Sequence, residues 1–167
     1  TNLVDYAIAA AAARGLRVAL NASPVDEALL RAPLDGVRWL VINEIEGGML
    51  AHTGENENEI LPALAQRWPA CAVVLTLGSR GVRYHDAAQD LQLDACRVDR
   101  VVDTTAAGDT FLGYFLACTV EGMPAREALR RSTMASALAI QVQGAAGSIP
   151  PRAAVEQALA EGRFGMR

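Results

Sequence analysis

Short aliphatic runs alternate with amphipathic segments along the first half of the chain. Strands are predicted at residues 17–21, 39–42 and 72–75. Helices are predicted at residues 4–14, 26–34, 44–52 and 60–67. Strands that are apolar throughout, without alternation, and are separated by helices indicate a parallel sheet covered on both faces. The sequence therefore predicts an α/β fold of the doubly wound, mostly parallel type.

The pattern changes after Gly81. Residues 82–85 and 91–98 are predicted as strands, and the polar residues 86–90 between them leave no room for a crossover helix. We therefore expect an antiparallel edge to the sheet. From residue 110 the pattern is helical, with helices expected over residues 110–120, 125–142 and about 151–160.

Composition excludes several classes of protein. The chain has 167 residues, 51% of them hydrophobic, and a net charge of −4 with no block of like charge. This favours a packed core and argues against a nucleic-acid or membrane-surface partner. No apolar run approaches the roughly 20 residues of a membrane span, and there is no signal-peptide pattern. Cys71, Cys96 and Cys118 lie apart in apolar stretches, so we expect buried thiols and a cytoplasmic protein.

The strongest chemical signal is the segment at residues 103–109, Asp-Thr-Thr-Ala-Ala-Gly-Asp, which follows a predicted strand at residues 100–102 and precedes a predicted helix. Small residues let the backbone approach a ligand, and the free N–H groups at a helix start favour an anion. Asp109 could accept a proton from an attacking hydroxyl there. The same residue could instead be only a helix cap.

Asn43 and Glu46 follow the strand at residues 39–42, at the carboxyl end where ligands bind in open α/β sheets. Their oxygen atoms could hold a hydrated Mg²⁺. The spacing also fits an N-cap with Glu at the third helical position.

Two further segments carry weaker signals. Residues 76–81, Thr-Leu-Gly-Ser-Arg-Gly, could expose backbone to a ligand or form an ordinary glycine turn. Residues 139–150 contain a helix end whose carbonyl groups need partners, either a bound cation or a helix cap.

The segment Asp-Thr-Thr-Ala-Ala-Gly-Asp-Thr-Phe at residues 103–111 resembles the signature of the ribokinase family of carbohydrate kinases, the PfkB type. The other three segments resemble further motifs of that family, in the right order. The resemblance implies that Asp109 is the catalytic base and that the backbone of Ala106, Ala107 and Gly108 forms an anion hole. The family more often has glycine at the position of Ala106.

The resemblance also implies ligand contacts elsewhere. Nucleotide contacts fall on Asn43, Thr76, Gly78, Ser79, Arg80, Gly81, Gly108 and Thr133. The resemblance implies that Asn43 and Glu46 bind Mg²⁺. It also implies that a monovalent cation, K⁺, is bound by Asp103, Thr105, Ala139, Val142, Gly144 and Ser148. Relatives often have His or Asn where this chain has Thr133.

We interpret residues 1–167 as the C-terminal nucleotide-binding and catalytic part of a ribokinase-like domain, without its N-terminal half and lid. The expected partners are ATP and a small sugar, ribose first, and the parent protein is compatible with a homodimer. The fragment alone is expected to be weak or inactive. Alternatives are a kinase for a nucleoside or keto-deoxy sugar acid, or a degenerate relative that binds nucleotide without turnover. A dinucleotide-binding oxidoreductase is disfavoured because no early strand is followed by Gly-x-Gly-x-x-Gly.

Overall fold

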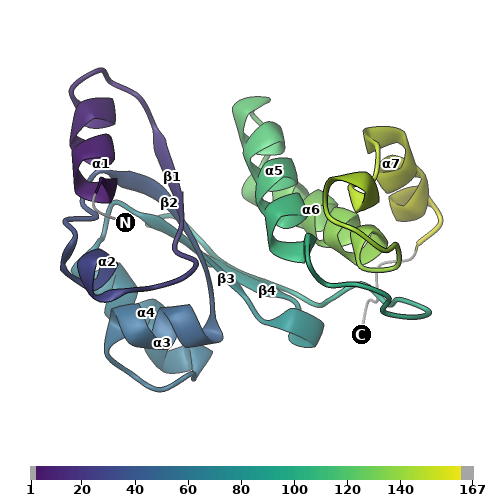
Figure 1. Ribbon diagram of the computed structural model, residues 1–167, viewed down its shortest axis with the longest axis horizontal. Helices are drawn as coiled ribbons and strands as arrows, with labels where there is room; N and C mark the ends of the chain where they lie inside the picture. The colour runs from purple at the N-terminus through teal and green to yellow at the C-terminus, as the bar shows by residue number, and fades with distance from the viewer. Residues whose placement is uncertain (1–2, 163–167) are drawn as a thin grey trace. The chain divides into compact units, whose positions relative to one another are not determined.

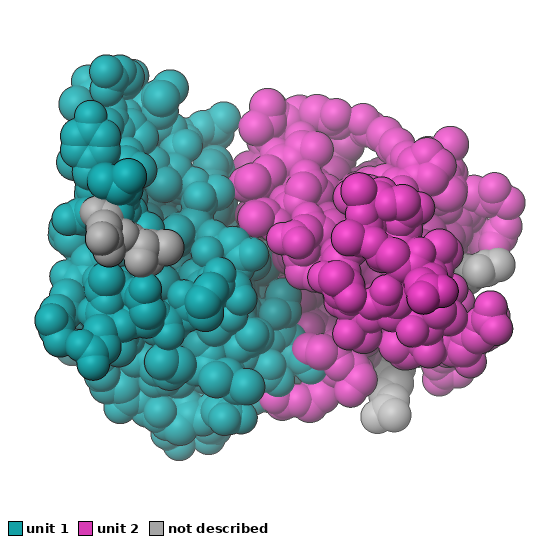
Figure 2. Space-filling view, viewed as in Figure 1, with its two compact units in different colours: residues 1–77, 83–92 teal, residues 78–82, 93–167 magenta. Residues whose placement is uncertain are grey.

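The computed structural model describes residues 3–162, and the chain forms two compact units (Figure 2). Unit 1 consists of the chain up to Leu77 together with Arg83–Gln92. Unit 2 consists of Gly78–Val82 and the chain from Leu93 onward.

The first part of the chain alternates helices with the strands of one sheet (Figure 1). The helices are α1 (Val4–Ala12), α2 (Glu27–Arg31), α3 (Glu44–Ala51) and α4 (Glu57–Arg67). The strands are β1 (Val18–Asn21), β2 (Val37–Asn43), β3 (Ala72–Thr76), β4 (Val82–His85) and β5 (Asp90–Leu93), and they lie in the order β1-β2-β3-β4-β5.

Strands β1, β2 and β3 are parallel, and their register aligns the strand ends that carry polar residues. Asn43 at the end of β2 pairs with Thr76 at the end of β3. On one face of β2, Leu40 and Ile42 belong to the core cluster that includes residues of α1–α4. Trp39 and Val41, which alternate with them along the strand, are buried as well. Burial of both sets explains why the sequence of β2 is apolar throughout.

The remaining strands form the antiparallel edge. The turn between β4 and β5 is closed by a hydrogen bond from the Asp86 N–H to the Gln89 carbonyl, 3.0 Å long. Asp86 also accepts from the Ala88 and Gln89 N–H groups, at 2.8 and 3.0 Å. A four-residue connection can join only antiparallel neighbours.

Unit 2 contains helices α5 (Ala107–Val120), α6 (Ala125–Ala139) and α7 (Arg152–Ala160), with short 3₁₀ turns at Gly78–Arg80 and Ala146–Ser148. The rings of Phe111 and Phe115 stack on α5 with centroids 6.4 Å apart. Met134 and Ala135 of α6 pack in one core cluster with Val155 of α7. These apolar contacts hold α6 and α7 together.

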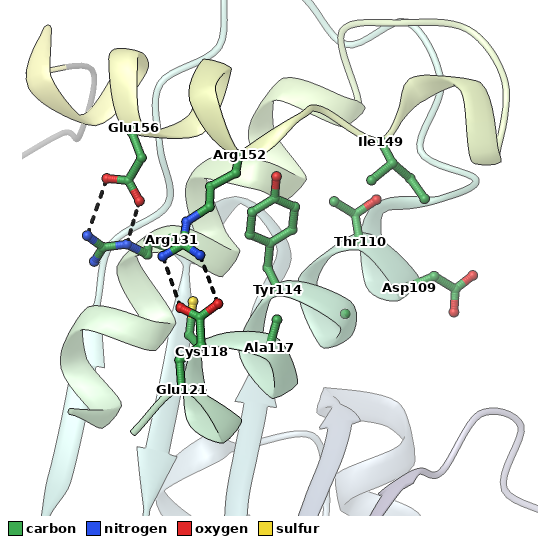
Figure 3. A pocket seen from close by; sticks show the side chains of 11 residues that line it. Asp109, Thr110, Tyr114, Ala117, Cys118, Glu121, Arg131, Ile149, Arg152 and Glu156 are labelled. Atoms are coloured by element: carbon green, nitrogen blue, oxygen red, sulfur yellow. Dashed lines mark hydrogen bonds and ion pairs between the residues drawn. The ribbon is translucent and has the colours of Figure 1, made fainter. Parts of the chain in front are cut away.

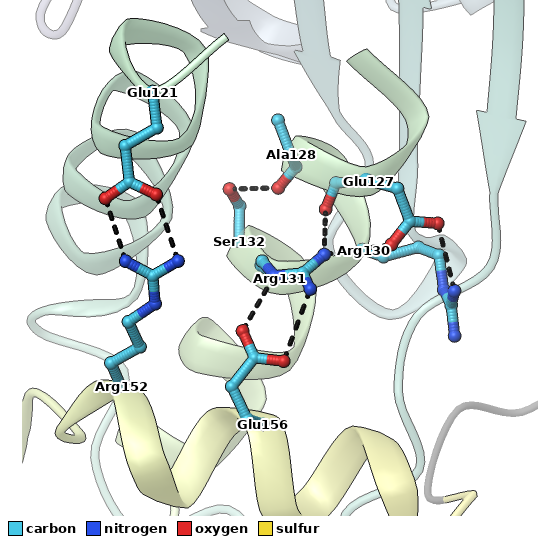
Figure 4. Close-up of polar contacts among 8 residues, drawn as sticks. All are labelled: Glu121, Glu127, Ala128, Arg130, Arg131, Ser132, Arg152 and Glu156. Atoms are coloured by element: carbon cyan, nitrogen blue, oxygen red, sulfur yellow. Dashed lines mark hydrogen bonds and ion pairs between the residues drawn. The ribbon is translucent and has the colours of Figure 1, made fainter. Parts of the chain in front are cut away.

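Charged contacts reinforce the same helices (Figure 4). Arg131 of α6 pairs with Glu127 one turn earlier, at 2.9 Å, and with Glu156 of α7, at 2.8 Å. Arg152 of α7 makes two hydrogen bonds to the Glu121 carboxylate at the end of α5, at 2.8 and 2.9 Å.

The structure confirms the parallel strands, the antiparallel edge and three buried, unpaired cysteines. The expected strand over residues 91–98 ends at Leu93, and residues 100–102 form none. There the Val102 and Asp103 N–H groups both donate to the Ile140 carbonyl, at 2.7 and 3.2 Å, instead of to a strand. Among residues 3–162, no helix combines the length and hydropathy needed to cross a bilayer.

Candidate active site

The start of α5 presents free backbone donors beside an exposed carboxylate. The helix begins at Ala107, three residues earlier than the sequence predicts, with Ala106 as its N-cap and no side-chain cap. The N–H groups of Gly108 and Asp109 have no hydrogen-bond partner among the described residues. Asp109 lies in the first helical turn and is exposed. It is therefore not the N-cap, and its carboxylate is available to a ligand.

Gly108 offers access rather than a backbone conformation that only glycine can adopt. A Cβ atom added at this position would meet nothing within 4 Å. A small residue here leaves the helix start open to a phosphate-sized group.

Asp103 connects the segment before α5 to the segment after α6. One carboxylate oxygen accepts from the Thr105 hydroxyl and from the Thr105 N–H at 2.9 Å, and the other accepts from the Gly144 N–H at 3.0 Å. The hydroxyl of Thr105 and the two N–H groups lower the pKa of Asp103 to about 2. The structure thus brings together two segments that lie 41 residues apart.

The oxygen atoms around this connection suit a monovalent cation. The carbonyl groups of Thr105, Val142 and Gly144 accept no hydrogen bond from any described residue. The Ala139 carbonyl accepts from the Val142 N–H at 3.0 Å, and the Ser148 hydroxyl donates to the Ala145 carbonyl at 2.7 Å. Both oxygens keep a lone pair. Unpaired carbonyls and a carboxylate are hard oxygen ligands, so the residues fit K⁺.

Asn43 and Glu46 of unit 1 form a complete capping box at the start of α3. Each backbone N–H donates to the other side chain at 2.9 Å. The capping alternative is therefore present in the structure. Glu46 is buried, and one of its carboxylate oxygens already accepts the Asn43 N–H. The pair is therefore better suited to bind the water molecules of a Mg²⁺ ion held by nucleotide phosphates than to coordinate the ion directly. The described residues contain no cluster of three His, Cys, Asp or Glu side chains suited to a metal.

Thr76 and the turn that follows it fall in different units. In unit 1, Thr76 donates its hydroxyl to the Ile42 carbonyl at 3.2 Å, beside Asn43. In unit 2, Gly78, Ser79 and Arg80 are exposed on the 3₁₀ turn, and the Gly81 N–H donates to the Gly78 carbonyl at 3.2 Å. The exposed backbone at Gly78–Arg80 is accessible to a ligand.

Thr133 is buried within α6, and its hydroxyl has no partner among the described residues. Burial of an unpaired hydroxyl is unfavourable unless a ligand or water pairs with it. Its neighbour on the next turn, Ser136, instead donates to the Ala107 carbonyl at the start of α5, at 3.0 Å.

A pocket of about 300 Å³ opens from Asp109 along α5 (Figure 3). Its lining residues come from three helices and the turn before α7: Asp109, Thr110, Gly113, Tyr114, Ala117, Cys118, Glu121, Arg131, Ile149, Arg152 and Glu156. Apart from Asp109, sequence reasoning identified none of them as site residues. No signal in the sequence could have found them, because they come together only in the folded chain.

Polar side chains at the ends of parallel strands, and a helix start with free N–H groups, are features of α/β proteins that bind phosphate groups. The chain belongs to the pfkB family of carbohydrate kinases, whose model matches residues 2–152.

Individual relatives agree with this assignment. The chain is 35% identical to a ribokinase of Schizosaccharomyces pombe over 154 residues, which cover 88% of this chain and 48% of the relative. It resembles the structure of Arabidopsis thaliana ribokinase complexed with ribose and ATP, with a TM-score of 0.80 and 31% identity, over 93% of this chain and 51% of that one. It also resembles a Burkholderia thailandensis nucleoside kinase in complex with inosine, with a TM-score of 0.77 and 27% identity, over 96% of this chain and 53% of that one. The chain thus spans about half the length of these relatives.

Proposed function

We propose that this chain supplies the nucleotide-binding and catalytic part of an ATP-dependent sugar kinase, with Asp109 as the general base. One observation carries the proposal: the carboxylate of Asp109 is exposed and lies in the same helical turn as the N–H groups of Gly108 and Asp109, and none of these groups has a partner among residues 3–162. A base and an anion site are thereby held within one turn of α5.

In the proposed step, Asp109 takes the proton of an acceptor hydroxyl as its oxygen forms a bond to the γ-phosphorus of ATP. The bond between that phosphorus and the oxygen bridging to the β-phosphate breaks, and ADP leaves with the electron pair. The free N–H groups at the start of α5 stabilise the negative charge on the transferring group. Mg²⁺ would neutralise charge on the nucleotide phosphates, with Asn43 and Glu46 acting through water.

The other nucleotide contacts belong to the same proposal. They comprise Thr76, the turn at residues 78–81, and Thr133, whose buried hydroxyl lacks a partner among the described residues. Ala106 and Ala107 belong to the anion site in the same proposal, although the Ala107 N–H donates to the Thr104 carbonyl at 3.1 Å. The segment joined by Asp103 and Gly144 would hold K⁺ and keep the residues before α5 in place.

A sugar is the acceptor we propose, with ribose first, since two of the relatives above are ribokinases. The nucleoside kinase with inosine supports a nucleoside as the second candidate. Because the chain spans about half of these relatives, we propose that it binds ATP by itself but turns over little.

The test uses a hybrid in which this chain replaces the segment that it matches in the S. pombe ribokinase. ADP release is measured with ribose, other sugars and inosine, in the presence of Mg²⁺, with and without K⁺. We expect Asp109→Asn to lower kcat by about 10³-fold or more while ATP binding to the 167-residue chain, measured by calorimetry, is unchanged. Equal turnover by the Asp109→Asn hybrid would exclude Asp109 as the base.

Gly108→Ala is the matched variant for the anion site. Because the added Cβ meets nothing within 4 Å, the free energy of unfolding should not fall, while kcat should. If the Gly108→Ala hybrid keeps its kcat, the transferring phosphate group does not approach the backbone at Gly108.

A further inference from the structure

Tyr114 joins α5 to the end of the segment that carries most of the proposed K⁺ ligands. It lies in the second turn of α5, and its hydroxyl donates to the Pro150 carbonyl at 2.6 Å (Figure 3). Pro150 is two residues beyond Ser148, the last of those ligands along the chain. We call residues 139–150 the cation segment. The bond connects its far end to the helix that begins beside Asp109.

The near end of the cation segment is held by other contacts. The Ile140 carbonyl accepts from the Asp103 N–H at 3.2 Å, and the Gly144 N–H donates to the Asp103 carboxylate at 3.0 Å. These bonds fix the part of the segment that contains the Val142 carbonyl. They do not reach Ser148.

The far part of the cation segment depends on Tyr114. Within residues 3–162, the other hydrogen bonds of residues 145–150 are local, from the Ser148 N–H and hydroxyl to the Ala145 carbonyl, at 3.1 and 2.7 Å. The bond from Tyr114 is therefore the hydrogen bond that ties this part to a helix. Ser148 lies between the two anchored ends.

The Tyr114 side chain is suited to act as an anchor. Its ring is partly buried and packs against the core cluster that contains Met134, Ala135 and Val155. Burial raises the pKa of Tyr114, so its hydroxyl keeps the proton that it donates. The ring is thus held by apolar contacts, while the hydroxyl is free to hold the chain at Pro150.

We propose that Tyr114 is a positioning residue for the monovalent cation, acting through its bond to Pro150 on the ligands at the far end of the cation segment. Partners outside the ligand shell orient the ligands of a bound ion, and their loss weakens binding. Tyr114 would act on the cation and not on the proton transfer at Asp109. The proposal rests on the K⁺ site of the proposed function.

The first experiment follows thermal unfolding of the 167-residue chain as K⁺ is added, with tetramethylammonium chloride keeping the ionic strength constant. A cation that binds only the folded chain raises the unfolding midpoint, and the rise gives its dissociation constant. We expect Tyr114→Phe, which keeps the ring, to raise the K⁺ dissociation constant about tenfold. A purely structural bond would lower the midpoint equally at every K⁺ concentration. An unchanged dissociation constant would therefore overturn the proposal.

Tyr84→Phe is the matched control. The Tyr84 hydroxyl donates to the Asp86 carboxylate at 2.6 Å, within unit 1, so the same chemical change removes a bond of the same length outside unit 2. We expect the K⁺ dissociation constant of Tyr84→Phe to equal that of the wild type, and a rise as large as that of Tyr114→Phe would contradict the assignment. If the wild type does not respond to K⁺, the K⁺ site and this proposal both fail. If the wild type responds and Tyr114→Phe responds identically, this proposal alone fails.

A second experiment separates positioning from chemistry. ADP release by the S. pombe hybrid is measured against K⁺ concentration with saturating ATP and ribose. We expect Tyr114→Phe to need about tenfold more K⁺ for half of its maximal rate, and to reach the wild-type kcat at saturating K⁺. Asp109→Asn should stay slow at every K⁺ concentration. A low kcat that K⁺ does not restore in Tyr114→Phe would place its role elsewhere and overturn the proposal.

Discussion

The two glycines of the turn at residues 78–81 have different physical reasons to be glycine. Gly78 and Gly81 both have positive φ, 55° and 100°. A Cβ at Gly78 would meet open space, whereas one at Gly81 would collide with the Leu93 carbonyl oxygen and lie 2.7 Å from the Ala95 nitrogen. Gly81 is therefore required by the fold itself, whatever its backbone binds, whereas the space beside Gly78 is open to a ligand.

This difference predicts unequal losses of stability. Gly81→Ala should lower the free energy of unfolding by about 3 kcal/mol or more, because backbone atoms cannot move aside easily. Gly78→Ala should cost about 1 kcal/mol, the cost of the left-handed conformation alone. Urea denaturation of both variants measures the two losses, and equal losses would contradict the assignment.

Asp103 allows a prediction about pH. Hydrogen bonds from Thr105 and Gly144 lower the pKa of Asp103 to about 2 from its ordinary 3.8. A lowered folded-state pKa means that these bonds stabilise the fold fully above about pH 4, and that the contribution is lost as pH falls through about 2. The carboxyl carbon of Asp103, followed by NMR, should titrate near pH 2.

Thr105→Val provides the control, because the Thr105 hydroxyl is the largest cause of the shift. Removing it should move the pKa of Asp103 back toward its ordinary value, while the bonds from the two N–H groups keep part of the shift. An unchanged titration in Thr105→Val would show that the hydroxyl is not responsible.

At the scale of elements, the sequence predicted whether a segment is a helix or a strand better than it predicted the residues at which the segment begins and ends. The strand over Ala72–Thr76 was recognisable because residues 72–75 are all apolar, and the structure buries all four. The start of α5 was placed too late, since Ala106 caps the helix without a side-chain hydrogen bond and so leaves no sequence signal. The valines at residues 101 and 102 suggested a strand, yet both side chains are exposed. Their β-propensity was overridden by the hydrogen bonds to Ile140.

The attachment of α7 to α6 should depend on Arg131. This side chain is one-fifth exposed and holds Glu127 and Glu156 together. Arg131→Leu should lower the free energy of unfolding by about 1–3 kcal/mol, because two carboxylates lose a partly buried partner. Thermal or urea unfolding measures this loss.

Arg31 provides a matched comparison. It pairs with Glu27 one turn away at 2.9 Å, but both side chains are about four-fifths exposed. Arg31→Leu should change stability by less than about 0.5 kcal/mol, since solvent screens such a pair. A loss as large as that of Arg131→Leu would show that burial of the pair is not what matters.

At the scale of the whole molecule, the sequence predicted the layered α/β architecture but not the pocket beside Asp109. Asp109 could be predicted because it belongs to a motif of a few consecutive residues, which is visible in the sequence. The pocket is formed by residues from three helices between Asp109 and Glu156, and its key property, the pairing of both arginines, exists only after folding. Spacing along the chain carries no information about such a surface.

Both units bury their thiols, and this gives a test of the complete fold. Burial raises the pKa of Cys71 in unit 1 to about 11 and that of Cys96 in unit 2 to about 12, and it also raises that of Cys118. At pH 8 the reactive thiolate is therefore scarce as well as inaccessible. We expect Ellman's reagent to react with none of the three thiols on the timescale of minutes in the native chain, and with all three in 6 M guanidinium chloride. Rapid reaction of one thiol in the native chain, located by mass spectrometry, would show that the core around that cysteine is open.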